Sequence, residues 1–196
     1  LTWTMQSFKL KQGQRLFSAF GNSPMGYAFP AAIGASIALG KKEIICIDGD
    51  GSFQMNVQEL QTLATQKLPV KIFVLDNRGY GIIKQFQELY LDNHFEGVDA
   101  TTGVTNPDFV ALAKVYGLPG KLVKNNRELR KAIRWALAQK GPCMVQVLLD
   151  PNQKIVPKLT FGKPIEDLSP LMSRREFLAN MIVPTVDADH SLTEAN

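Results

Sequence analysis

A carboxylate between two glycines is the first feature of the sequence that could take part in chemistry. Asp50 follows the apolar run 43–47 and lies between Gly49 and Gly51. Glycines let the backbone approach an anion closely, and a helix that begins here would present free N–H groups to it. The carboxylate would repel a phosphate unless a cation lay between the two. The sequence therefore predicts a phosphate site that is bridged to Asp50 by a metal ion.

Asn77 could supply a second oxygen ligand for such an ion. It follows the apolar run 70–75 and comes 27 residues after Asp50, which is about the length of one helix and one strand. If the two runs form neighbouring parallel strands, both side chains reach the carboxyl edge of the sheet, where open α/β folds bind ligands. A carboxylate, an amide oxygen and a backbone carbonyl suit Mg²⁺. We therefore expect a magnesium site at this edge.

Apolar runs alternate with helical patterns along the chain, which is typical of an α/β fold. Strands are expected at 43–47, 70–75, 118–123 and 143–149. Their nearly continuous apolar character indicates a mainly parallel sheet that is covered on both faces. Helices are expected at 24–39, 53–66, 107–116, 127–139 and 174–181. The predicted fold is a three-layer α/β/α domain.

Two of these helices carry further expectations. The helix at 24–39 is rich in alanine and glycine, so we expect it to be buried with close backbone contacts. The helix at 107–116 is expected to have Asn106 as its N-cap and Pro107 at its first position.

The domain organisation is expected to be simple, with the main domain at 21–186 after an N-terminal linker at 1–20. A C-terminal extension is expected from about residue 151, because prolines interrupt the chain from there on. The polar end, 187–196, is expected to be disordered. Since the chain begins with Leu1, we also expect it to be an excised part of a longer protein.

Composition argues against several classes of function. The net charge is +4, but the basic residues are scattered or lie on the polar side of the helix at 127–139, so no nucleic-acid partner is expected. No apolar stretch is long enough to cross a membrane, and no secretory signal is visible. Cys46 and Cys143 lie in predicted buried strands, and we expect reduced thiols in a cytoplasmic protein.

Taken together, the motifs resemble a known family. Gly-Asp-Gly at 49–51, followed at this spacing by Asp-Asn at 76–77, is similar to the pattern of thiamine-diphosphate-dependent enzymes, normally Gly-Asp-Gly and then Asn-Asn. The segment 24–35, Pro-Met-Gly-Tyr-Ala-Phe-Pro-Ala-Ala-Ile-Gly-Ala, resembles the large subunit of acetolactate (acetohydroxyacid) synthase. The likeness runs from about Gly21 to Pro157. It implies a domain that binds thiamine diphosphate and Mg²⁺ in an enzyme that decarboxylates or ligates 2-oxo acids.

The resemblance also implies roles for individual residues. Asp50, Asn77 and the main-chain carbonyl of Gly79 would bind Mg²⁺. Met25 would be the apolar wedge that holds the cofactor bent. The remaining residues that it places against the cofactor are Ser23, Gly49, Gly51, Ser52, Phe53 and Ile82. No catalytic residue is expected in this chain, because in the family the activating glutamate lies on a separate pyrimidine-binding domain.

The resemblance has consequences for partners. The missing pyrimidine-binding domain would complete the active site, and the parent protein would be a homodimer or homotetramer that acts on a small 2-oxo acid.

Three positions depart from the synthase pattern. Asp76 replaces an asparagine, Ser23 stands where the synthases usually have glycine, and Phe86 takes the place of a tryptophan associated with acceptor choice. Acetolactate is therefore not predicted as the product.

Two other interpretations stay open at this point. A dinucleotide-binding oxidoreductase domain would also have glycines after a strand, but Gln54 stands where its third glycine belongs. A non-catalytic regulatory domain with an old cofactor fold would fit the missing glutamate. His94, in a loop expected at 89–105, is a possible acid–base group, although a lone loop histidine is more often simply solvated.

Overall fold

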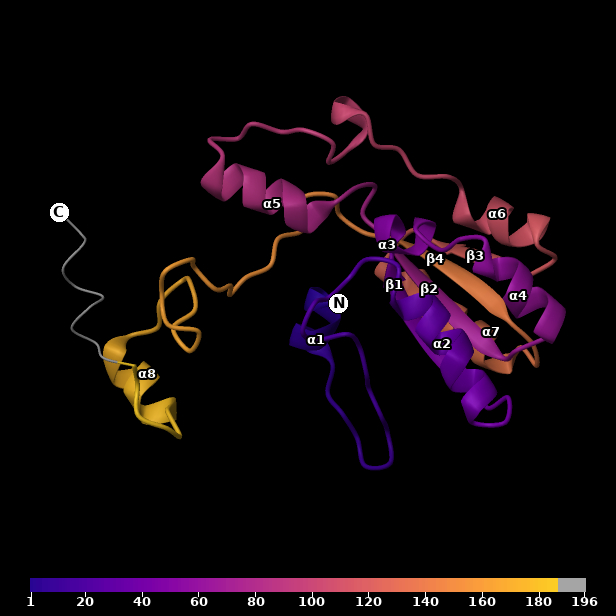
Figure 1. Ribbon diagram of the computed structural model, residues 1–196, viewed down its shortest axis with the longest axis horizontal. Helices are drawn as coiled ribbons and strands as arrows, with labels where there is room; N and C mark the ends of the chain where they lie inside the picture. Colours follow the sequence, from indigo (N-terminus) through magenta and orange to yellow (C-terminus); the bar gives the residue numbers. More distant parts are fainter. Residues whose placement is uncertain (187–196) are drawn as a thin grey trace. The chain divides into compact units, whose positions relative to one another are not determined.

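The computed structural model describes residues 1–186, so the predicted disorder of 187–196 lies outside the described residues. The chain divides into two compact units, one at Leu1–Gln153 and one that begins at Lys154. The first unit contains all four named strands (Figure 1). They are β1 (Ile44–Gly49), β2 (Val70–Asp76), β3 (Gly120–Val123) and β4 (Cys143–Leu148).

The four strands form one parallel sheet with the order β1-β2-β4-β3. Parallel neighbours need crossover connections, and helices supply them here. The helices of the first unit are α1 (Thr2–Ser7), α2 (Ala28–Ala38), α3 (Asp50–Gln54), α4 (Glu59–Gln66), α5 (Gly81–Tyr90), the 3₁₀ turn η1 (Ala100–Thr102), α6 (Phe109–Val115) and α7 (Asn126–Ala138). The α/β class and the parallel sheet that the sequence predicts are confirmed.

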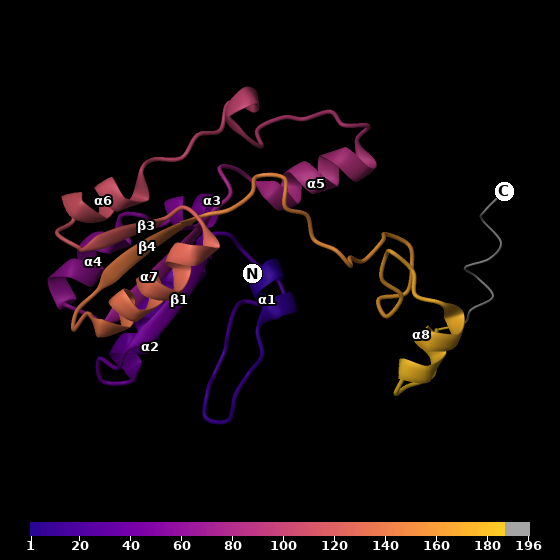
Figure 2. The same cartoon turned by 180° about the vertical axis from the view of Figure 1, so that it is seen from behind.

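Alternation along the strands divides the apolar core into two clusters, one on each face of the sheet. On one face, α2, α3, α4 and α6 cover Val70, Ile72 and Val74 of β2. On the other face, α7 covers Phe73 of β2 together with residues of β3 and β4. Helix α2 lies on the near side of the sheet in Figure 1, and α7 lies on the near side in Figure 2, which is the view from behind. The strands are thus covered on both faces, as their continuous apolar runs indicate.

The two cysteines belong to different clusters. Cys46 of β1 packs in the cluster under α2, whereas Cys143 of β4 packs under α7. The sheet therefore separates the two thiols, and β2 lies between their strands. Both are free and buried, which confirms the expectation of reduced thiols.

The prediction of one continuous helix at 53–66 is wrong. The structure has two helices there, because the chain turns at residues 55–58 between α3 and α4. At this turn the Asn56 side chain donates to the carbonyl oxygen of Gly26 at 2.7 Å. Gly26 has φ +84°, and a Cβ there would lie 2.6 Å from the Asn56 amide nitrogen. The break therefore makes room for the segment that precedes α2.

Two helices in the first unit were not expected, namely α1 and α5. Helix α5 has an amphipathic sequence but no buried residue, so its formation does not rest on core packing. The helix expected from residue 107 begins at Phe109, and its N-cap is Asp108, whose side chain accepts from the N–H of Ala111 at 2.9 Å. The prediction of Asn106 as the N-cap is wrong, since the Asn106 side chain is bonded elsewhere.

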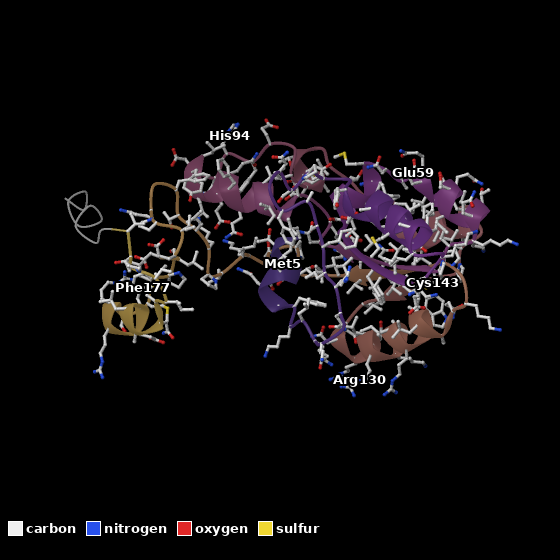
Figure 3. All side chains as sticks on the ribbon, turned by 60° about the horizontal axis from the view of Figure 1, so that its bottom comes forward. Met5, Glu59, His94, Arg130, Cys143 and Phe177 are labelled. Carbon is white, nitrogen blue, oxygen red and sulfur yellow. The ribbon has the colours of Figure 1, made fainter. Side chains whose placement is uncertain are left out.

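One expectation about burial also needs correction. Helix α2 buries only one face, through Phe29, Ala32, Ile33 and Ser36. A Cβ at Gly34 would meet nothing within 4 Å, so the predicted close contact is absent among the described residues. In α7 the buried residues are Ala132 and Ala136, whereas Ile133 and Leu137 are 38% and 46% exposed. The basic residues of α7 are exposed, and Figure 3 shows Arg130 on its outer side.

The second unit has little regular structure in its described part. It contains α8 (Arg174–Asn180), whose N-cap Ser173 accepts from the N–H of Glu176 at 3.3 Å. Arg174 binds both carboxylate oxygens of Asp167, at 2.7 and 2.8 Å. Over the described residues, no helix combines the length and the apolar character that a bilayer crossing demands.

Lys71 is a buried cation near the start of β2. Its side chain is fully buried, and its ammonium donates to the carbonyl oxygens of Gln139 and Gly141 at 2.5 and 2.7 Å. Glu43 lies 3.5 Å away. Lys71 thus satisfies the carbonyl groups that follow the last turn of α7.

We predict that Lys71→Met lowers the free energy of unfolding by about 2 kcal/mol, because it leaves two half-buried carbonyl groups without their donor. Urea denaturation measures the difference. Lys131→Met, at an exposed position of the same helix, serves as the control and should stay within about 0.5 kcal/mol of the wild type. Equal losses in the two variants would contradict the role of Lys71.

Candidate functional site

The carboxyl ends of β1 and β2 bring the two predicted ligands together. Gly49 ends β1, Asp50 begins α3, and Asn77 follows β2 directly. The strands are neighbours in register, with Gly49 opposite Leu75. Asp50 and Asn77 are both buried, at 3% and 6% exposure. The side chains therefore converge at the sheet edge where α/β folds bind ligands.

Three polar groups meet at this point. One side-chain amide position of Asn77 lies 3.1 Å from Oδ1 of Asp50 and 2.8 Å from the carbonyl oxygen of Gly79. With its nitrogen in that position, Asn77 donates to both oxygens. With its oxygen there, three oxygen atoms face one another. An amide can turn over with little change of shape, so both arrangements are open to Asn77.

The spacing of these atoms fits a small hard cation. Oxygen ligands that lie about 2.1 Å from Mg²⁺ in an octahedral shell are separated from their neighbours by about 3.0 Å. The 2.8 and 3.1 Å separations match this edge length. Among the described residues, no three His, Cys, Asp or Glu side chains group as metal ligands. An ion at this edge would therefore depend on one carboxylate, one amide and one carbonyl.

The carboxylates at this edge are shielded from water. Burial raises the pKa of Asp50 to about 6, while the N–H groups of Gly51 and Gly79 act in the opposite direction. The neighbouring Asp76 adds to the rise. Burial also raises the pKa of Asp48, against the hydrogen bonds from Ser52 and Gly49. Buried negative charge of this kind is compensated when a cation binds.

The second carboxylate oxygen of Asp50 faces away from Asn77 and is held by two donors. Oδ2 accepts from the N–H of Gly79 at 3.0 Å and from the side-chain amide of Asn106 at 2.5 Å. Oδ1 of Asn106 in turn accepts from Nε2 of Gln54 at 2.6 Å. Gln54 lies one turn after Asp50 on α3. Asp50 is thereby fixed by groups from three separate segments.

Glycine at 51 lets two side chains lie close to the backbone. A Cβ there would collide with the ring of Tyr80 and would lie 3.3 Å from Cε of Met25. Met25 is 42% exposed. The segment that carries it is fastened by the N–H of Gly26, which donates to Oγ of Ser52 at 2.9 Å. The structure therefore brings Met25, Gly51 and Ser52 together, with Tyr80 beside them.

The segment around Val98 holds the loop that carries Gly79. The N–H of Tyr80 donates to the carbonyl oxygen of Val98 at 2.8 Å, and any Cβ at Gly79 would collide with that same oxygen. Next to Val98, Asp99 accepts from Lys84 of α5 at 2.8 Å. The Lys84 ammonium lowers the pKa of Asp99 to about 2. Residues of the loop expected at 89–105 thus anchor the Gly79 backbone.

Asp76, which replaces the first asparagine of the family pattern, is buried beside Asp50 and has further partners of its own. Its carboxylate accepts from the side-chain amide of Gln146 on β4 at 2.7 Å and from the N–H of Arg78 at 2.9 Å. It therefore shapes the turn after β2. Arg78 adopts φ +64° in that turn.

The other predicted cofactor-binding residues differ in how accessible their side chains are. Phe53 is fully buried against Phe29 and Phe109, so only its main chain can serve a ligand. Ile82 is exposed in the first turn of α5. Ser23 is exposed, and its hydroxyl donates to the carbonyl oxygen of Phe20 at 3.3 Å. No contact joins Ser23 to Asp50 or Asn77.

His94 does not join the site. It is exposed in the turn after α5, and Figure 3 shows it at the outer rim of the molecule. The residues that sequence reasoning missed are Gln54, Asn106, Gln146, Tyr80 and Trp3. The six-membered ring of Trp3 lies 3.2 Å from the position of a Cβ on Gly81. Of these, only Asn106 and Gln54 lie at positions that a sequence motif distinguishes, Asn106 as an N-cap residue type and Gln54 in the place of a third glycine.

Comparisons with known proteins identify relatives of this chain. The family model described as "Thiamine pyrophosphate enzyme, C-terminal TPP binding domain" matches residues 1–147. The chain is 36% identical over 178 residues to the acetolactate synthase large subunit of Cyanidium caldarium. It is 34% identical over 160 residues to the acetolactate synthase isozyme 2 large subunit of Escherichia coli (strain K12).

A solved structure is similar as well. It is the Rhodococcus jostii RHA1 thiamine diphosphate-dependent 4-hydroxybenzoylformate decarboxylase, with a TM-score of 0.58 and 32% sequence identity. The similarity covers 64% of this chain and 23% of that one. The two synthase relatives are matched over 91% and 82% of this chain, but over only 30% and 29% of their own length. The chain therefore spans less than a third of these relatives.

We predict that the burial of Asp50 makes stability depend on pH when no divalent metal is present. Its raised pKa means that the folded chain holds the proton more tightly than the unfolded chain, in which the pKa is about 3.8. The stability due to protonated Asp50 is present below about pH 4 and is lost as pH rises through about 6. Asp50→Asn removes this loss.

Urea denaturation from pH 4 to 7 tests this prediction. The difference in unfolding free energy between Asp50→Asn and the wild type should move in favour of the variant as pH rises. Asp92→Asn, at an exposed loop position, should show no such trend. A difference for Asp50→Asn that stays constant over this range would contradict the prediction.

Proposed function

Because the chain belongs to the family of thiamine pyrophosphate enzyme C-terminal TPP binding domains, we propose that it holds the diphosphate of thiamine diphosphate through Mg²⁺. It is related to acetolactate synthase large subunits. The observation that carries the proposal is the convergence of three groups, with the Asn77 amide 3.1 Å from Oδ1 of Asp50 and 2.8 Å from the carbonyl oxygen of Gly79. The dinucleotide interpretation has no support from the family match.

In this proposal, Oδ1 of Asp50, the Asn77 amide oxygen and the Gly79 carbonyl oxygen bind the ion. Asn77 turns its amide over when metal replaces the hydrogen bonds that it donates to the other two oxygens. The positive charge then compensates both Asp50 and the diphosphate. Gly51 and Ser52, at the start of α3, offer main-chain N–H groups to the phosphate oxygens.

Met25 and Tyr80 lie together over Gly51. We assign Met25 the support of the cofactor's bent conformation, since its thioether end projects beside the diphosphate loop and is partly exposed. When bound, the cofactor supplies the electron sink that a 2-oxo acid needs in order to lose its carboxylate. The role of this chain would be to bind and orient that cofactor, and Ile82, exposed on α5, is one of the residues that would contact it.

We further propose that the parent enzyme is a 2-oxo acid decarboxylase or carboligase and that its active site is completed outside this chain. Support comes from the relatives, which are named as acetolactate synthases and as a decarboxylase. The chain covers less than a third of them, which leaves room for a pyrimidine-binding domain with the activating glutamate. A homodimer or homotetramer, with sites shared between subunits, follows from the same proposal.

We predict that the chain binds thiamine diphosphate only with Mg²⁺ and that Asp50→Asn weakens this binding at least 100-fold, roughly the upper effect of losing even an outer-shell contact. Isothermal titration calorimetry with and without Mg²⁺ measures it. Asp92→Asn, which makes the same chemical change at an exposed loop position, should bind like the wild type. Binding that does not depend on Mg²⁺, or no binding at all, would contradict the proposed site.

We predict that the purified chain, supplied with thiamine diphosphate and Mg²⁺, releases no carbon dioxide from pyruvate above the background rate. The expected reason is the absence of the glutamate that activates the cofactor in this family. A carbon dioxide assay with a full-length acetolactate synthase as the positive control measures this. Turnover by the chain alone would place all catalytic groups within residues 1–196.

A further inference from the structure

The proposed function assigns no role to Asn106 or Gln54. Both are half-buried, and they form a chain of hydrogen bonds that ends on Asp50. Asn106 precedes α6, at the far end of the segment that follows α5, and Gln54 ends α3. The hydrogen bond between Gln54 and Asn106 joins two segments 52 residues apart in sequence.

The two oxygens of the Asp50 carboxylate have different surroundings. Oδ1 faces Asn77, beside the carbonyl oxygen of Gly79. Oδ2 accepts two N–H groups, one from the Gly79 backbone and one from Asn106. A carboxylate oxygen has about two lone-pair sites, so Oδ2 is filled. Only Oδ1 is available to an ion unless these hydrogen bonds are broken.

The number of oxygens that Asp50 can offer bears directly on the choice of ion. Mg²⁺ requires a near-octahedral shell with ligands at 2.0–2.1 Å, which a carboxylate serves through one oxygen. Ca²⁺ takes six to eight ligands at about 2.3–2.6 Å and readily accepts both oxygens of one carboxylate. Hydrogen bonds that occupy Oδ2 therefore favour the binding of Mg²⁺ over that of Ca²⁺.

We propose that Asn106, held by Gln54, is a positioning residue that restricts Asp50 to single-oxygen binding and so makes the site select Mg²⁺ over Ca²⁺. This inference rests on the proposed metal site. The direction of the hydrogen bonds from Gln54 through Asn106 to Asp50 follows from the charge of Asp50. Ionised Asp50 only accepts, so Asn106 must turn its NH₂ group toward Oδ2, and its Oδ1 then requires the donor of Gln54.

Asn106→Ala frees Oδ2 from its side-chain donor. The affinities of the chain for MgCl₂ and CaCl₂, each titrated calorimetrically with saturating thiamine diphosphate, give the Mg²⁺/Ca²⁺ affinity ratio. We expect this ratio to fall about 10-fold or more, the size of effect that outer-shell contacts have on metal sites. Thr105→Ala, in the same loop, should keep the ratio of the wild type. An unchanged ratio in Asn106→Ala would overturn the inference.

Two variants at Gln54 separate positioning from general support of the loop. Gln54→Met removes the donor but leaves Asn106 able to donate to Asp50, so its ratio should change less than twofold. Gln54→Glu is closer in shape but puts an acceptor against Oδ1 of Asn106, and this repulsion is relieved when the Asn106 amide turns its NH₂ group away from Asp50 toward position 54. Its ratio should fall further than that of Gln54→Met. The reverse order is the result of a purely structural role and would overturn the inference.

A measurement without metal keeps the inference testable if a variant does not fold. The side-chain amide protons of Asn106, followed by NMR in the wild-type chain, should exchange with solvent at least about 10-fold more slowly than those of the exposed Asn152. Equal exchange rates would overturn it. A wild-type chain that binds neither ion contradicts the proposed function itself, whereas binding with an unchanged ratio in Asn106→Ala contradicts only this inference.

Discussion

The structure of the site depends on one electrostatic constraint, which is that oxygen atoms from two neighbouring strands are held close together where water is excluded. Asp50 follows β1, and Asn77 and Gly79 follow β2. Burial at this edge raises the pKa of Asp50 to about 6. With its nitrogen turned toward them, the Asn77 amide donates to Oδ1 of Asp50 and to the carbonyl oxygen of Gly79. In the proposed function, a cation would be bound by these same oxygen atoms. Proteins keep such unfavourable arrangements where ligands are bound.

The surrounding segments hold this arrangement through close backbone contacts. Gly79 lies against the carbonyl oxygen of Val98, and Gly26 lies against Asn56, so neither position has room for a side chain. Each contact connects a loop at the carboxyl edge to a segment distant in sequence. The site is therefore not carried by the glycine motif alone, because the loops before α2 and after α5 complete it.

Predictions from local pattern succeeded where burial alone decides structure, and they failed where distant polar contacts decide it. The runs that became β1, β2 and β4 are mostly apolar, because both faces of the sheet are covered. The helix expected at 53–66 was broken by the contact of Asn56 with Gly26, which no local pattern encodes. Asn106 has the residue type of an N-cap, yet its amide is used by Asp50 and Asp108 caps the helix.

The sequence by itself determined the α/β class, the parallel strands and the pair Asp50 and Asn77, because strand periodicity and motif spacing are local properties. It did not determine which oxygen of Asp50 is free, or that Tyr80 and Met25 lie together over Gly51. Those features were decided by tertiary structure. Hydrogen bonds and steric contacts between residues tens of positions apart exist only after the sheet has brought its loops to one edge.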